Sequence, residues 1–132
     1  MGNSGNCLNP FFFAVCGQHI KNQLSGVVSL KPDGGYDNRD LCEWVIEFPV
    51  GKRISLKTTF FDLEGRYPAC NLDKLQIRDG ADMNGTLIGS FCGINKPPHV
   101  QSSSNVLYIR FESDRSINGK GFLLEFSEAP LG

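Results

Sequence analysis

The chain has 132 residues, and 13 lysines and arginines against 14 aspartates and glutamates give it a formal net charge of −1. This length is that of one domain with a core of its own. The near-neutral charge argues against nucleic-acid-binding and membrane-surface proteins, which carry a basic excess. A hydrophobic fraction of 40% with 10 phenylalanines argues against disorder. No apolar run approaches the roughly 18 residues of a membrane span, so we expect no membrane insertion.

The predicted elements are strands, because no window of a dozen residues keeps a helical apolar spacing free of glycine or proline. The clearest strand is 42–48, where Cys42, Trp44, Ile46 and Phe48 lie on one face and Glu43, Val45 and Glu47 on the other. In chain order, strands are predicted at 26–30, 42–48, 53–62, 72–79, 87–91, 106–113 and 121–127. Glycine, proline and asparagine turns separate them. Seven or more strands without intervening helices predict a single all-β domain, an antiparallel β-sandwich.

Five cysteines are scattered along the chain with no Cys-x-x-Cys spacing: Cys7, Cys16, Cys42, Cys70 and Cys92. The spacing disfavours a zinc cluster or a thioredoxin-type motif. It favours disulfides and an oxidising compartment, with buried free thiols in a cytosolic protein as the alternative. The sequon Asn84-Gly85-Thr86 makes Asn84 a candidate glycosylation site and gives weak support to secretion.

Most of the chain resembles a CUB domain, the extracellular β-sandwich module of complement proteases, tolloid-type proteases, cubilin-like receptors and spermadhesins. Four motifs carry the resemblance: C-x-W-x-I at 42–46, D-x-L-x-I-x-D-G at 73–80, F-x-S-D-x-S at 111–116 and G-x-G-F at 119–122. The resemblance implies a jelly-roll-like fold over residues 16–128, with 1–15 as a leader or appended segment and 129–132 as a C-terminal tail. It also implies two disulfides, Cys16–Cys42 and Cys70–Cys92. Cys7 is then unpaired, or it links this chain to another chain in a disulfide-linked dimer.

Three acids lie beside strand ends or loops rather than within strands: Glu64, Asp73 and Asp114. The residues alone leave two interpretations open, solvated surface acids or oxygen ligands of Ca²⁺. In the calcium-binding type of CUB domain, acids at the matching positions hold Ca²⁺, and the backbone carbonyl of Ser116 is a further ligand. The resemblance therefore implies a Ca²⁺ site whose acids also accept a lysine of an extracellular protein partner.

Two departures from that family pattern change the surroundings of the implied site. Many calcium-binding members have asparagine where this chain has Ile117. A backbone carbonyl or Asn118, one residue later, is then the candidate substitute ligand. The usual Ser-Pro-x-Tyr-Pro stretch is replaced by residues 29–36, which removes the tyrosine that supports the site. Tyr67, near Glu64, is a candidate ligand-binding residue in its place, or a packing residue.

Other sites have weaker support. His19 and His99 lack any accompanying nucleophile motif, so we expect no enzyme activity. Lys52, Arg53 and Lys57 are either a charged hairpin rim or a small basic patch for a sulfated glycan. Two alternative functions follow: a calcium-independent, spermadhesin-like binder of carbohydrate or glycosaminoglycan, and a spacer or oligomerisation domain. In each case we expect a secreted protein or the extracellular part of a membrane protein.

Overall fold

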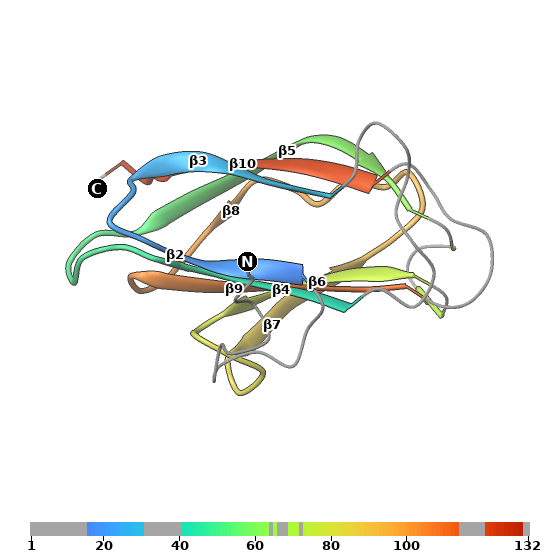
Figure 1. The fold of residues 1–132 in the computed structure, drawn as a ribbon, viewed down its shortest axis with the longest axis horizontal. Coiled ribbons are helices and arrows are strands. Elements are labelled where there is room, and N and C mark those ends of the chain that lie inside the picture. Colours follow the sequence, from blue (N-terminus) through green and yellow to red (C-terminus); the bar gives the residue numbers. More distant parts are fainter. Residues whose placement is uncertain are drawn as a thin grey trace, which may run out of the picture.

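The computed structural model describes residues 16–30, 41–63, 65, 69–71, 73–113 and 121–130. In these residues the regular elements are all strands, and they form two sheets stacked face to face (Figure 1). The four-stranded sheet has the order β3 (Ser25–Leu30), β10 (Gly121–Glu128), β5 (Ile54–Asp62) and β8 (Val100–Gln101). The five-stranded sheet has the order β2 (Cys16–Lys21), β4 (Leu41–Glu47), β9 (Val106–Glu112), β6 (Lys74–Asp79) and β7 (Thr86–Phe91).

The predicted all-β sandwich is confirmed, and its pairings are antiparallel with one exception. Strand β2 lies parallel to β4 at the edge of the five-stranded sheet. Neither β2 nor β8 was predicted. Strand β2 is mostly polar and, of its described side chains, buries only Ile20, so it has no clear alternation, and β8 has only two residues.

The core fills the space between the sheets with inward-facing apolar side chains from both. Phe122 of β10 is fully buried and contacts Trp44 edge-on, with ring centroids 5.7 Å apart. It also packs against Phe111 of β9 at 5.7 Å. Trp44 and Phe111 belong to the opposite sheet, so these three rings join the two layers. The expectation that Trp44 lies in the core is confirmed.

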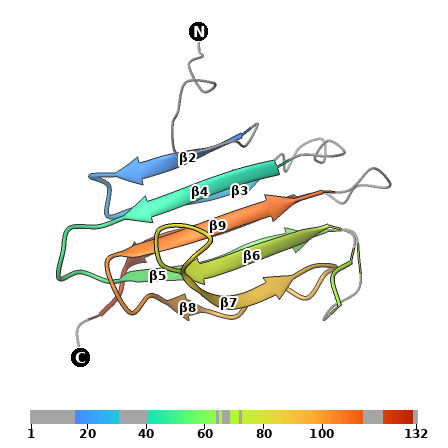
Figure 2. The same cartoon turned by 90° about the horizontal axis from the view of Figure 1, so that it is seen from below.

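The antiparallel order brings many strand ends together at one end of the sandwich. Strands β3, β5, β7 and β9 end there, and β4, β6 and β10 begin there, as the pairs Phe122–Leu30, Gly121–Asp62 and Leu41–Glu112 show. Figure 2 shows this end on the right. We call it the Asp73 end, because Asp73 directly precedes β6. The opposite end, with the β6–β7 turn over 80–85, is called the hairpin end.

Candidate functional site

The chain that leaves β5 packs against the end of β7 and against Asp73. The Leu63 N–H donates to the carbonyl of Gly93, with an N–O distance of 2.9 Å. A Cβ built on Gly65 would lie 3.5 Å from Cβ of Cys92 and 3.7 Å from the Asp73 carbonyl oxygen. A Cβ on Gly93 would lie 3.0 Å from the Gly65 oxygen, and Gly93 has a left-handed φ of 67°, so this position favours glycine. Leu63 therefore lies beside Gly93, and Gly65 lies beside Asp73.

The end of β9 approaches the same place from the other side. Glu112 lies opposite Lys74, the residue after Asp73, and Ser113 follows Glu112 directly. The Glu112 carboxylate has two cationic neighbours, Lys74 Nζ at 3.8 Å and Arg110 Nε at 3.8 Å. The Glu112 charge is thus already compensated. The chain leaving Ser113 starts beside Asp73.

A disulfide anchors this end of the sandwich. Cys70 and Cys92 are bonded, with Cα atoms 5.6 Å apart, which is the pairing that the family resemblance implies. Both cysteines are buried, and Cys70 has a φ of 50°, a left-handed conformation that is uncommon outside glycine. Cys42 is also disulfide-bonded, and β2 places the backbone of Cys16 opposite it.

Asp73 is the most unusual residue of this end, because its exposed fraction is 0%. Removing an ionised carboxylate from water is costly unless the group is paired, hydrogen-bonded or bound to a metal ion. Asp73 is therefore held in a specific environment and is not a solvated surface acid. The interpretation of a simply exposed acid is wrong for this residue.

The other predicted ligand residues lie outside the described residues: Glu64, Tyr67, Asp114, Ser116 and Asn118. Cys7 lies outside them as well. In the described part of the chain, no group of three or more histidine, cysteine, aspartate or glutamate side chains is arranged to hold a metal ion. Leu63, Gly65 and Ser113 are the chain neighbours of Glu64 and Asp114, and each lies at the Asp73 end.

A buried polar cluster on the outer face of the five-stranded sheet was not predicted. The Tyr108 hydroxyl donates to Oε2 of Glu43, and Arg110 Nη1 lies 3.3 Å from the same oxygen. Tyr108 and Glu43 are buried, although they face away from the core between the sheets. The alternation of 106–113 placed Tyr108 and Arg110 on one face of their strand. Only the pairing of β4 with β9 brought Glu43 beside them.

The pKa of Tyr108 rises from 10.0 to about 12, because burial disfavours the phenolate and the hydroxyl donates to Glu43. The folded protein therefore holds this proton more tightly than the unfolded chain does. The resulting stabilisation is complete below pH 10 and declines as the pH rises toward 12. We expect Tyr108→Phe to be destabilised at pH 8, by about 1–3 kcal/mol, and the gap from wild type to narrow at pH 11. Denaturant unfolding at both pH values tests this, and a constant gap would contradict it.

The remaining candidate groups have ordinary structural partners. His19 Nε2 lies 2.9 Å from Oε1 of Glu47, and His99 Nε2 lies 2.5 Å from the Ser55 hydroxyl oxygen. Lys52 Nζ is 2.9 Å from Oε2 of Glu128. Arg53 donates to the Pro130 carbonyl at 3.5 Å, and Lys57 lies opposite Glu125. The three cations of the suggested basic patch are thus each beside an acid or a carbonyl.

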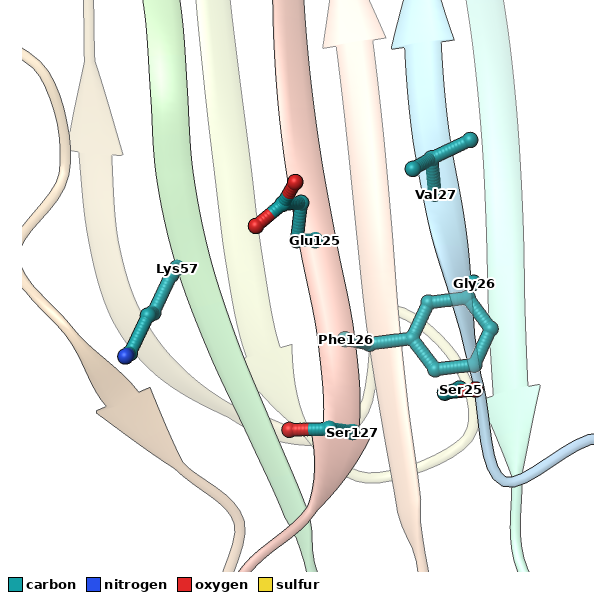
Figure 3. A pocket seen from close by; sticks show the side chains of 7 residues that line it. All are labelled: Ser25, Gly26, Val27, Lys57, Glu125, Phe126 and Ser127. Atoms are coloured by element: carbon teal, nitrogen blue, oxygen red, sulfur yellow. The ribbon is translucent and has the colours of Figure 1, made fainter.

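A shallow hollow lies on the outer face of the four-stranded sheet, away from the Asp73 end. Figure 3 shows its lining, with Lys57, Glu125 and Ser127 on β5 and β10 beside Ser25 of β3. Sites for small ligands are typically concave and mostly apolar. This hollow is shallow and open to solvent, so it lacks the concave shape of such a site.

The comparisons with known proteins agree with this geometry. The family model described as CUB domain matches residues 16–126. Mouse Tolloid-like protein 2 is 39% identical over 94% of this chain, which spans 12% of that protein. Human procollagen C-endopeptidase enhancer 1 is 33% identical over 96% of the chain, which spans 27% of it. The crystal structure of the MASP-1 CUB2 domain bound to Ca²⁺ superposes with a TM-score of 0.71 at 25% identity, over 83% of this chain and 96% of that one.

The chain belongs to the CUB domain family. CUB domains are non-catalytic modules that mediate protein interactions, and they occur in secreted proteins and in the extracellular parts of membrane proteins. In the described ranges, no helix is long and apolar enough to cross a membrane. The expected extracellular location is confirmed by this membership.

Proposed function

We propose that this CUB domain binds an extracellular protein partner that presents an exposed lysine, through loops at the Asp73 end that Ca²⁺ holds in place. The observation that carries the proposal is the complete burial of Asp73 where the chain after β5, the start of β6 and the end of β9 come together. A fully desolvated carboxylate beside a disulfide is suited to binding a cation.

The donor set fits a hard cation. The carboxylates of Glu64, Asp73 and Asp114 and the backbone carbonyl of Ser116 are oxygen ligands, which Ca²⁺ prefers, and the Asn118 side chain adds another oxygen of the same kind. Bound Ca²⁺ would supply positive charge that removes the repulsion between the carboxylates. The disulfide and the glycines at 65 and 93 hold the framework around Asp73.

Recognition of the partner follows from the same acids. A carboxylate has about four lone-pair positions, so an oxygen that holds a cation can also accept a charge-assisted hydrogen bond from an ammonium group. Loops already ordered by the ion lose less entropy when the partner binds. Tyr67, close to Glu64 in the sequence, would cover the aliphatic part of the lysine.

The alternative functions have less support from the described residues. A glycosaminoglycan binder needs uncompensated basic charge, and Lys52 is paired with Glu128. A spacer role, or a dimer linked through Cys7, stays a prediction that rests on the odd cysteine count.

We expect Ca²⁺ to raise the melting temperature of the protein relative to EGTA. Free Ca²⁺ at about 100 times its Kd stabilises the folded state by about 2.7 kcal/mol. Asp73→Asn keeps the shape of the side chain and removes its charge, so the variant should fold but lose most of this stabilisation. Glu125→Gln is the control, because Glu125 is exposed on the sheet face and its loss removes the same charge. Equal melting temperatures in Ca²⁺ and EGTA, with no heat of binding in calorimetry, would rule out the calcium site.

The lysine preference needs a separate measurement. A short lysine-rich peptide is compared with the same peptide whose lysines are acetylated, which replaces each ammonium charge by a neutral amide. We expect the first peptide to bind in Ca²⁺ and to be released by EGTA, and the acetylated peptide to bind at least tenfold more weakly. Binding that is unchanged by EGTA or by acetylation would contradict the proposed recognition.

A further inference from the structure

The sequon Asn84-Gly85-Thr86 lies in the turn between β6 and β7, at the hairpin end. Asn84 and Thr86 are both exposed. Asp82 fixes the turn: its side-chain Oδ1 accepts the Asn84 N–H at 2.9 Å, and its carbonyl accepts the Gly85 N–H at 3.0 Å. The acceptor asparagine is therefore presented on an ordered and accessible turn.

Two close contacts hold the tip of the β6–β7 hairpin in place. Arg78 Nη1 donates to the carbonyl of Gly85 at 3.0 Å, across the two strands. A Cβ on Gly80 would lie only 2.8 Å from Cα of Gly85, so the two backbones are in close contact. Because the backbones of Gly80 and Gly85 fill the space between the two strands, the side chains of the turn extend into solvent.

Exposed apolar side chains lie on both sides of the sequon. Met83 is 45% exposed, Leu87 is 44% exposed and Ile88 is 37% exposed. Leu87 and Ile88 belong to β7, which lies at the edge of the five-stranded sheet as described and pairs with β6. Strand β7 contains no charged residue and no proline, the features that usually protect an edge strand from pairing with other chains.

One protective feature is present in β7. The register shifts between Ile77 and Arg78. Ile77 pairs with Gly89 and Arg78 pairs with Leu87, so Ile88 is an extra residue on β7. Such a bulge disturbs the pairing surface of an edge strand. It leaves the apolar side chains exposed, however, and these are the groups that favour association.

We propose that Asn84 carries an N-linked glycan and that this glycan covers the apolar edge formed by Met83, Leu87 and Ile88. The extracellular location of CUB domains means that the chain passes through the secretory pathway, where this modification occurs. The Asn84 Nδ2 forms a bond to the anomeric carbon of an oligosaccharide carried on a lipid pyrophosphate. The bond from that carbon to the pyrophosphate oxygen breaks, the lipid pyrophosphate leaves, and Nδ2 loses one proton to the transferase.

The position of the glycan is compatible with partner binding. Strand β6 begins at the Asp73 end and runs to the hairpin end, so Asn84 and Asp73 lie at opposite ends of the sandwich (Figure 2). A bulky glycan on the hairpin therefore protects one end of the domain and leaves the other free for a protein partner.

Occupancy is tested by secreting the 132-residue chain from mammalian cells and treating it with peptide N-glycosidase. We expect a loss of mass equal to one oligosaccharide. The shift should disappear in Asn84→Gln and in Thr86→Ala, whereas Thr86→Ser keeps the sequon and should keep the shift. A secreted wild-type protein with no shift would overturn the proposal.

The role of the glycan is tested by sedimentation of the secreted proteins in EGTA, which separates this question from the calcium site. All proteins carry Cys7→Ser, which removes any dimer linked through Cys7. We expect the glycosylated protein with Asn84 to be monomeric, and Asn84→Gln and Thr86→Ala to self-associate at the same concentration. Adding Leu87→Lys to Asn84→Gln should restore the monomer, and adding Leu24→Lys, at an exposed position outside this edge, should not. Equal association of glycosylated and unglycosylated protein would overturn the covering role.

Discussion

Phe122→Ala should lower the free energy of unfolding by about 3–5 kcal/mol, the usual cost of removing a fully buried aromatic ring. Phe122 is 0% exposed, and its ring contacts Trp44 and Phe111 of the opposite sheet. Truncation leaves a cavity between the two layers that neither ring can fill without moving its own strand. A loss of this size is a large part of the 5–15 kcal/mol that stabilises a typical domain.

Phe60→Ala is the matched control for this prediction, because it removes the same ring from the same sheet. Phe60 lies on β5, is 37% exposed and pairs with Leu123 on the outer face. We expect its loss to cost about 1 kcal/mol, since much less apolar area returns to water. Denaturant unfolding of the two variants should therefore differ severalfold, and equal costs would show that Phe122 does not join the two sheets as described.

Removing the Cys70–Cys92 disulfide with the double variant Cys70→Ala, Cys92→Ala should destabilise the protein by about 3 kcal/mol. This is the chain-entropy value for a loop of this size, since the two cysteines are 22 residues apart in the sequence. The effect should extend beyond stability, because Cys92 supports Gly65 and Cys70 holds the chain that leads to Asp73. We therefore expect the stabilisation by Ca²⁺ to fall together with the melting temperature.

The two effects of the disulfide can be separated by measuring Ca²⁺ binding well below the melting temperature of the variant. Weaker Ca²⁺ binding by the folded variant would support a role for the disulfide in arranging the proposed site. If the folded variant binds Ca²⁺ as tightly as wild type, the disulfide acts on stability alone. The proposed role in positioning Asp73 would then be wrong.

Much of the fold could be predicted from the sequence, because alternation and turn residues act over a few positions. The strand at 42–48 was recognised from Cys42, Trp44 and Ile46, and these residues are buried as expected. Strand β2 was missed because it is held mainly by its parallel pairing with β4, which depends on residues more than 20 positions away. The cluster of Glu43, Tyr108 and Arg110 was missed for the same reason, since its members come from two paired strands.

The candidate site was predicted only through the family motif. The local sequence does not distinguish Asp73 from other acids beside strand ends. Most such acids are exposed to solvent. Asp73 is buried at the place where the chain after β5 packs against Cys92 and Gly93, which are about 30 residues downstream of Leu63. No local sequence pattern predicts this contact between the chain after β5 and residues 92 and 93.

The sequence by itself determined that this chain is one extracellular, disulfide-containing β-sandwich of the CUB family. Strand period and turn chemistry are local properties that predict a β-sandwich, and the four CUB motifs carry the resemblance that implies the family and its location. The tertiary structure alone decided that Asp73 is removed from water and that the sequon lies at the opposite end beside an apolar edge strand. These properties come from strand register and from packing between distant segments, and the same acids and asparagine in another register would be ordinary surface residues.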